Sequence, residues 1–287
     1  MKEVITMWKS TKMIILVALS AAIYAVVLIV FKGVLVIIPG ITELRPANVF
    51  PIIFGIMFGP AGAWGSALGN LIGDFFGTLS PGSIGGFVGN FYLGFVAYKL
   101  WGALLPKKEA TIQNVNSWPR FIAYVIVSLT AAVACGVIIG WWLDLLGMVP
   151  FAFLASVISF NNFLHELVLG PPLLLILYPL IKKWGLIWTD IMAPEDVSAA
   201  PALRLGGILM LVGSLGGLVV GLLLSVGVAG QQIFAFAGKS GQASLGVVVF
   251  LFIALIVASG FLLGGREQFA EEEEEEEGTA AKPALAK

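Results

Sequence analysis

Charged residues are scarce in this chain: they account for 11% of 287 residues, whereas 59% are hydrophobic and the mean hydropathy is +1.00. A water-soluble domain needs about a quarter of its residues charged to cover its surface. The composition therefore excludes an ordinary soluble domain. It predicts an all-α, polytopic membrane helix bundle whose surface faces lipid.

Histidine and cysteine occur once each, as His165 and Cys135, which excludes a His/Cys metal cluster and an internal disulfide. A Gly-x-Ser-x-Gly elbow is missing, and Gly238-Lys239-Ser240 lacks the earlier glycine of a phosphate loop because Ile233 stands there. No Lys/Arg-rich stripe interleaved with aromatics suggests nucleic acid. We therefore expect no enzyme, no metal and no cofactor.

Apolar runs of about 20 residues predict seven spanning helices. They lie at 13–31, 60–80, 83–105, 119–146, 151–181, 203–229 and 245–264. A shorter apolar segment, 49–59, predicts an eighth helix that begins near Pro46 and does not cross fully on its own. The first run is too long for the core of a secretory signal, so we expect it to be retained.

Eight spans place the loops 105–119 and 182–202 and the C-terminus on the same side as the N-terminus. These segments hold most of the Lys and Arg residues between helices, which predicts a plasma-membrane protein with both termini in the cytoplasm. Composition divides the chain into a six-helix core (1–190), a linker (191–202), two additional transmembrane helices (203–266) and a tail (267–287). The tail contains Glu271–Glu277, and we expect it to be disordered.

Polar side chains within or beside the spans are the candidate binding residues, because such groups are costly in hydrocarbon unless hydrated or paired. Asn162 and Glu166 are four residues apart, as are Asn161 and His165, so each pair forms neighbours on one helix. Such groups either satisfy one another or line a hydrated cavity. The candidate set is Glu43, Arg45, Asn70, Asp74, Asn90, Trp141, Asn161, Asn162, His165 and Glu166.

Within this set, Arg45 would pair an anionic group of a solute. Trp141 would stack on a planar ring, or it anchors its helix at the membrane interface. The asparagines and acids would read the polar edge of the solute.

Several motifs in a fixed order resemble those of one family of membrane proteins. They are the small-residue run Ala18–Ala25, then Arg45-Pro46-Ala47-Asn48-Val49-Phe50-Pro51, Phe58–Gly65, Gly69–Asp74 and Gly170-Pro171-Pro172. Together they cover about residues 10–190, and this region resembles the substrate-binding (S) components of energy-coupling factor (ECF) transporters for vitamins and related micronutrients.

The resemblance implies a six-helix bundle that binds a vitamin-like or nucleobase-like solute on the outer face, under the long loop after the first helix. It also implies docking on a membrane coupling (T) protein that carries two ATPase subunits, through an Ala-x-x-x-Ala face formed by Ala18 and Ala22 or by Ala21 and Ala25. Two features depart from the family: the two extra C-terminal helices, and Lys2 in place of the histidine that metal-transporting relatives use.

Two alternatives remain at this stage. The chain could be a self-sufficient ion-coupled secondary transporter, with Asp74, His165 or Glu166 carrying protons. It could also be a membrane enzyme that uses His165 and Glu166 as acid and base.

Overall fold

A computed structural model describes residues 1–31, 36–38, 42–43, 45–225 and 242–269. The first half contains α1 (Glu3–Thr6), η1 (Met7–Lys9), α2 (Thr11–Phe31), β1 (Val36–Ile38), β2 (Thr42–Glu43), η2 (Pro46–Asn48), α3 (Val49–Phe58), α4 (Pro60–Asp74), α5 (Gly82–Leu104) and α6 (Lys107–Ala110). The second half contains α7 (Trp118–Leu145), α8 (Phe151–Lys183), α9 (Trp188–Ile191), η3 (Pro194–Asp196), α10 (Leu203–Leu211), the π-helical turn η4 (Val212–Gly216), α11 (Gly217–Ser225), α12 (Gln242–Leu262) and η5 (Arg266–Gln268).

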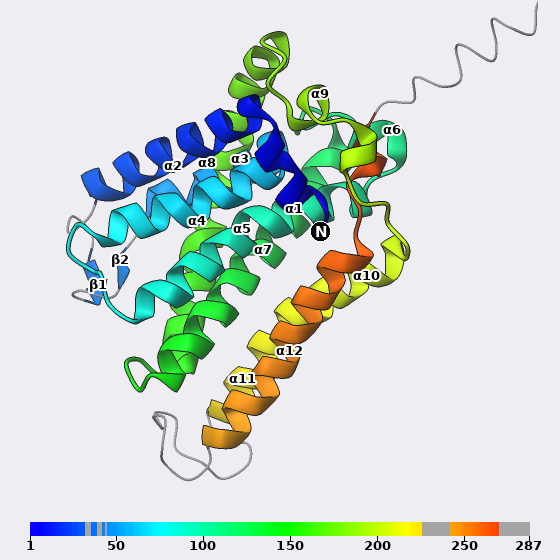
Figure 1. Ribbon diagram of the computed structural model, residues 1–287. Helices are drawn as coiled ribbons and strands as arrows, with labels where there is room; N and C mark the ends of the chain where they lie inside the picture. Colours follow the sequence, from blue (N-terminus) through cyan, green and yellow to red (C-terminus); the bar gives the residue numbers. More distant parts are fainter. Residues whose placement is uncertain (32–35, 39–41, 44, 226–241, 270–287) are drawn as a thin grey trace, which may run out of the picture.

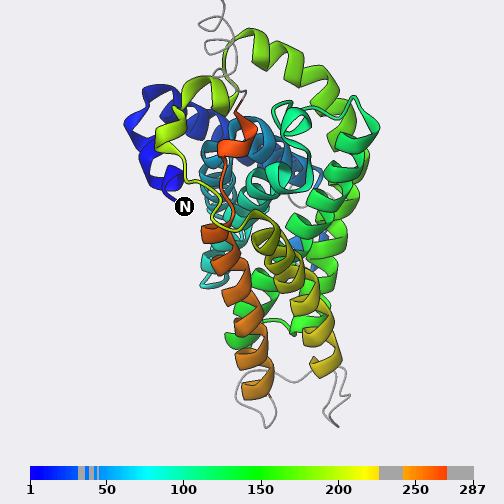
Figure 2. The ribbon, with the colours of Figure 1, turned by 90° about the vertical axis from the view of Figure 1, so that its right-hand side faces the viewer.

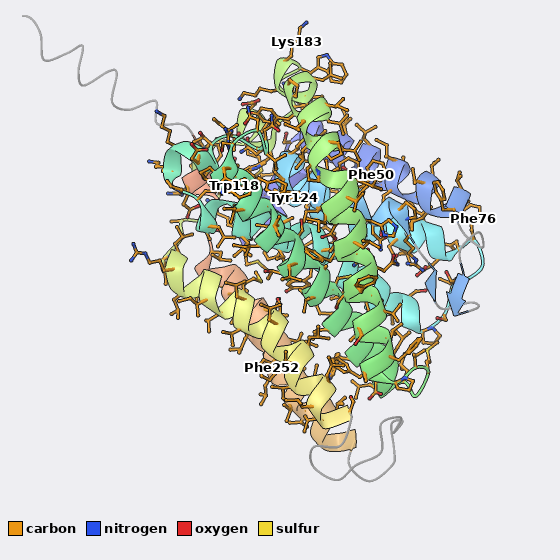
Figure 3. All side chains as sticks on the ribbon, turned by 180° about the vertical axis from the view of Figure 1, so that it is seen from behind. Phe50, Phe76, Trp118, Tyr124, Lys183 and Phe252 are labelled. Carbon is orange, nitrogen blue, oxygen red and sulfur yellow. The ribbon has the colours of Figure 1, made fainter. Side chains whose placement is uncertain are left out.

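The bundle has two distinct ends (Figure 1). One end, here called the ribbon end, carries the short antiparallel β1–β2 pair, the turn after α4 and the turn between α7 and α8. The opposite end, here called the terminal end, carries α1, α6 and α9. Among the residues labelled in Figure 3, Phe76 lies beside the ribbon and Lys183 lies at the end of α8.

Five described helical segments are long and apolar enough to cross a membrane. They are Thr11–Phe31, Trp118–Leu145, Phe151–Ile191, Leu203–Ser225 and Leu245–Leu262. The prediction of an all-α polytopic bundle is confirmed, with β1–β2 as a small addition. The helices α3 and α4, of 10 and 15 residues, are shorter than the ~20 residues that a span requires. A count of eight spans stays a prediction.

The predicted helix 60–80 ends at Asp74, and its junction with α3 is a sharp turn at Gly59. Gly59 has φ +57° and ψ −128°, a conformation that a glycine adopts without steric cost. A side chain at Gly62 would lie 2.1 Å from the carbonyl oxygen of Phe54, so α3 and α4 pack backbone against backbone. Two short helices thereby form a hairpin within the bundle.

The four-residue glycine spacing of α4 serves close helix packing, as small residues do where lipid surrounds a bundle. A Cβ atom at Gly65 would lie 2.4 Å from the Ser20 side chain of α2, and one at Gly69 would lie 2.9 Å from the carbonyl oxygen of Ala21. These contacts seat α2 against α4. They leave the opposite face of α2 exposed.

The two additional helices form a second hairpin, α10–α12, that packs along the core on the side away from α2 (Figures 1 and 2). Its own helices meet closely at Gly213, where a side chain would lie 2.8 Å from Ile256. Figure 3 labels Phe252 on this hairpin, whose ring lies against Gly216 and Gly217. The hairpin therefore has a glycine-based interface of its own.

A polar hub at the terminal end joins segments that are distant in sequence. Lys99 of α5 forms a buried ion pair with Glu3 of α1, and its ammonium donates to the carbonyl oxygens of Leu263 (2.9 Å) and Gly264 (3.0 Å) after α12. Glu3 also accepts from the Ser198 hydroxyl at 2.7 Å. The predicted linker 191–202 is thus bound to the N-terminus and to the end of the hairpin.

The described chain continues into the segment expected to be a disordered tail. Gln268 of η5 is buried and donates to the carbonyl oxygen of Tyr98 at 2.9 Å, and the Phe269 ring lies 5.2 Å from that of Trp188. Residues 270–287, including Glu271–Glu277, lie outside the described residues.

Candidate solute-binding site

A half-open cavity of about 650 Å³, including the space at its mouth, lies at the ribbon end of the core. It is bounded by η2, the end of α4, the 78–83 turn, the start of α5, the second half of α7 and the first half of α8. Its polar wall consists of Arg45, Asn48, Asn70, Asp74, Thr78, Ser80, Ser83, Asn90, Asn161 and Asn162. Its apolar wall consists of Ile139, Leu143, Met148, Leu154 and Ile158, with Cys135 between the two.

Local sequence explains how these side chains reach the cavity. Asn70 and Asp74 are one helical turn apart on α4, and Asp74 is the last residue of that helix. Gly86 of α5 faces them: a Cβ atom there would lie 2.8 Å from the Asn70 amide nitrogen and 3.6 Å from an Asp74 carboxylate oxygen. The glycine therefore keeps this part of the cavity open.

The charged part of the wall holds one acid and one base. Thr78 donates to the Asp74 carboxylate at 3.0 Å, and the Asn70 amide donates to it at 3.4 Å. The Arg45 guanidinium donates to the Asn70 oxygen at 3.5 Å, while the Arg45 backbone N–H donates to Asn161 at 3.4 Å. Asp74 is only 8% exposed, so a solute would meet a largely desolvated carboxylate.

A buried hydrogen-bond chain forms the floor of the cavity. The Tyr24 hydroxyl lies 2.8 Å from the side-chain amides of both Asn48 and Asn90. Asn90 donates to the Gly86 carbonyl oxygen at 2.8 Å, and the amides of Asn48 and Asn162 are hydrogen-bonded to each other. Three helices and η2 are thus joined by neutral polar groups.

The Asn48 amide nitrogen donates to the Asn162 side-chain oxygen, and the single hydroxyl proton of Tyr24 is directed at the side-chain oxygens of Asn48 and Asn90. Asn90 directs its own N–H group at the Gly86 carbonyl oxygen, so its oxygen is left for Tyr24. The Asn162 amide nitrogen has no hydrogen-bond partner among the described residues.

The structure brings six of the ten predicted residues onto the cavity wall. They are Arg45, Asn70, Asp74, Asn90, Asn161 and Asn162. The side chain of Glu43 lies outside the described residues, so its predicted role stays untested.

Three described candidates lie off the wall, which corrects their expected position. The Trp141 indole donates to the Gly246 carbonyl oxygen of α12 at 2.8 Å, so its ring faces the hairpin. His165 contacts the carbonyl oxygen of Asn161 at 2.7 Å, one turn back on the same helix. Glu166 is fully buried one turn beyond Asn162, and neither of its carboxylate oxygens has a hydrogen-bond partner among the described residues.

Sequence reasoning missed Tyr24 and Asn48 as parts of the site. Both carried a signal: a polar hydroxyl in an otherwise apolar helix, and an asparagine at the start of the short helix. Among the described residues, no three His, Cys, Asp or Glu side chains lie close enough together to hold a metal ion.

The exposed face of α2 distinguishes the two predicted alanine pairs. Ala21 and Ala25 are buried, at 5% and 3% exposure, against the α4 side of the bundle. Ala18 and Ala22 are exposed and lie on the outward face together with Ile15 and Val26. Only the outward pair is available to another membrane protein.

Fold and cavity together define a multi-pass membrane protein with a polar cavity at one end. The family model described as QueT transporter matches residues 14–179, more than half of the chain. The chain therefore belongs to the QueT transporter family and is an S component of an ECF transporter, which confirms the resemblance drawn from its motifs. No match was found among curated proteins or among solved structures.

Proposed function

We propose that this chain captures a nucleobase-like solute, a queuosine precursor, in the cavity at the ribbon end and passes it to an ECF transport complex. The observation that carries the proposal is the cavity itself. It combines an apolar wall with several convergent polar side chains, an arrangement typical of small-molecule sites.

The distribution of wall groups favours a flat solute with a polar edge. Ile139, Leu143 and Ile158 offer aliphatic surface for the faces of a ring, and the described lining residues include no aromatic side chain. Asn161 and Asn162 offer amides to the ring edge, and Asp74 offers a carboxylate to an N–H group or a cation. The stacking role first assigned to Trp141 thus passes to aliphatic side chains.

Charge placement supports an outward-facing cavity. The terminal end and its connections carry most of the basic residues outside the helices, among them Lys107 and Lys108 in α6 and Lys182 and Lys183 at the end of α8. Such residues concentrate on the cytoplasmic side of membrane proteins. We therefore place both termini in the cytoplasm and the cavity at the outer face of the plasma membrane.

The exposed Ala18–Ala22 face of α2 supports docking on the membrane coupling protein that carries the two ATPase subunits. Small side chains four residues apart allow a partner helix to approach closely in lipid. The α10–α12 hairpin lies on another side of the core, so it leaves this face uncovered. Membership of the QueT transporter family favours this mode of energy coupling over a self-sufficient ion-coupled carrier.

Binding of a radiolabelled queuosine precursor to the purified protein in detergent tests the proposal. Asn162→Ala and Asp74→Asn should each raise the Kd by roughly tenfold or more, since the first removes a buried hydrogen-bonding group from the wall and the second removes its negative charge. Asn116→Ala is the matched control, because Asn116 is exposed on the loop before α7. Equal affinity in the wild type and in both cavity variants would refute the site.

A further inference from the structure

The α10–α12 hairpin lies outside residues 14–179, the part of the chain that matches the family, yet it contacts the helices that form the apolar wall of the cavity. We propose that the hairpin holds the α7–α8 wall of the cavity in its solute-binding position, and that Trp141 is the positioning residue that joins the two. The inference rests on the proposed function only in taking this cavity as the binding site.

Trp141 is the main polar link between the cavity wall and the hairpin. Its indole N–H donates to the Gly246 carbonyl oxygen of α12 at 2.8 Å, and its ring centroid lies 5.7 Å from that of Phe250. Two residues further along α7, Leu143 lines the cavity. A shift of Trp141 therefore moves the cavity surface directly, because both residues belong to the same helix.

The second helix of the wall, α8, is held by α11. Phe151, the first residue of α8, packs on Gly221, where a Cβ atom would lie only 2.3 Å from the Phe151 ring. Leu154, one turn further along α8, lines the cavity. The hairpin thus contacts both helices beside the turn that carries Met148, another lining residue.

A brace must itself be immobile, and the hairpin is held at its far end as well. The carbonyl oxygens of Leu263 and Gly264, just after α12, accept hydrogen bonds from the buried Lys99 ammonium. Gln268 then donates to the Tyr98 carbonyl oxygen at 2.9 Å. The hairpin is therefore attached to α5 at the terminal end and to α7 and α8 near the cavity.

The first test compares Trp141→Phe with Trp118→Phe, a tryptophan 71% exposed at the other end of the same helix. Trp141→Phe keeps an aromatic ring against Phe250 and removes only the N–H donor. We expect the Kd for a queuosine precursor to rise roughly three- to tenfold through faster dissociation, the effect of one hydrogen bond. Trp118→Phe should leave the Kd within about twofold of the wild type.

The second test uses a matched pair of glycines on the hairpin. Gly221→Ala forces Phe151 to move, whereas Gly207→Ala is accommodated, because its nearest neighbour beyond its own helix lies 3.8 Å from the new Cβ atom. Hydrogen exchange across residues 143–154, measured without solute, should quicken in Trp141→Phe and Gly221→Ala and remain unchanged in Gly207→Ala. A merely destabilising change would instead quicken exchange throughout the bundle.

The two readouts separate this inference from the proposed function. If the wild type binds no queuosine precursor, the proposed solute is wrong, and the exchange data still decide whether the hairpin braces the wall. Unchanged exchange at 143–154 in both Trp141→Phe and Gly221→Ala would overturn the inference, whatever the solute. So would a Kd for both variants equal to that of their controls.

Discussion

The buried ion pair between Glu3 and Lys99 yields a stability prediction whose size follows from its surroundings. Both side chains are fully buried, and the Lys99 ammonium otherwise contacts neutral oxygens: two carbonyl groups and, at 3.5 Å, the Ser198 hydroxyl. Glu3→Gln would leave this cation without its main counter-charge. Breaking a buried pair from one side typically costs about 3–5 kcal/mol, and we expect a loss of unfolding free energy in that range.

The reciprocal change should cost less. In Lys99→Met, the Glu3 carboxylate keeps two partners: the N-terminal ammonium of Met1 at 3.3 Å and the Ser198 hydroxyl at 2.7 Å. The N-terminal ammonium is partly exposed, so it can supply the missing positive charge without a large desolvation cost. The double variant Glu3→Gln/Lys99→Met should recover part of the loss, because no unpaired buried cation remains.

Equilibrium unfolding of the purified protein in detergent, followed by tryptophan fluorescence, measures these differences. The control is Lys182→Gln, which breaks an ion pair with Asp190 at 2.6 Å whose lysine is 49% exposed; we expect a loss of at most about 1 kcal/mol. A Glu3→Gln loss no larger than that of Lys182→Gln would refute the reasoning. It would mean that, in Glu3→Gln, the hub does not keep the Lys99 ammonium both unpaired and away from water.

Three further predictions concern acidity, packing and docking. Burial alone would raise the pKa of the Glu3 carboxyl, but the adjacent Lys99 ammonium, a backbone hydrogen bond and the N-terminal ammonium together outweigh it and lower the pKa to about 2. The stabilisation present above pH ~4.5 is therefore lost as the pH falls towards 2, and the wild type should lose more stability than Glu3→Gln between pH 6 and pH 3 in the same unfolding assay. Gly65→Ala should lower the unfolding free energy by about 1–3 kcal/mol, since its Cβ atom would lie 2.4 Å from a side chain of α2. Gly73→Ala is the control: its Cβ atom would lie 3.3 Å from the nearest side chain, and we expect a change of less than about 1 kcal/mol. Equal losses in the two variants would contradict the close α2–α4 contact. Ala22→Trp should abolish co-purification with the coupling module while solute binding persists. The control Leu164→Trp, at an exposed site of α8, should leave both co-purification and solute binding intact. Retained co-purification in Ala22→Trp would argue against docking through α2.

The sequence alone was sufficient for the class of protein and for the identity of several site residues. Scarcity of charge and long apolar runs permit only a membrane bundle, because backbone groups in lipid must be satisfied within helices. Asp74 and Asn162 could be chosen for a similar reason: a polar side chain in a span is costly unless it faces a partner or a hydrated space. These arguments need only one helix at a time.

Tertiary structure decided everything that depends on how the helices are rotated and paired. Ala18 and Ala21 look alike in sequence, but packing on α4 buries Ala21 and leaves Ala18 exposed. Trp141 lies at the depth of the cavity, yet it faces the hairpin, where its indole N–H donates to the Gly246 carbonyl oxygen of α12. Sequence sets the depth of a side chain along its helix axis, whereas its direction around that axis is set by contacts with segments distant in the chain.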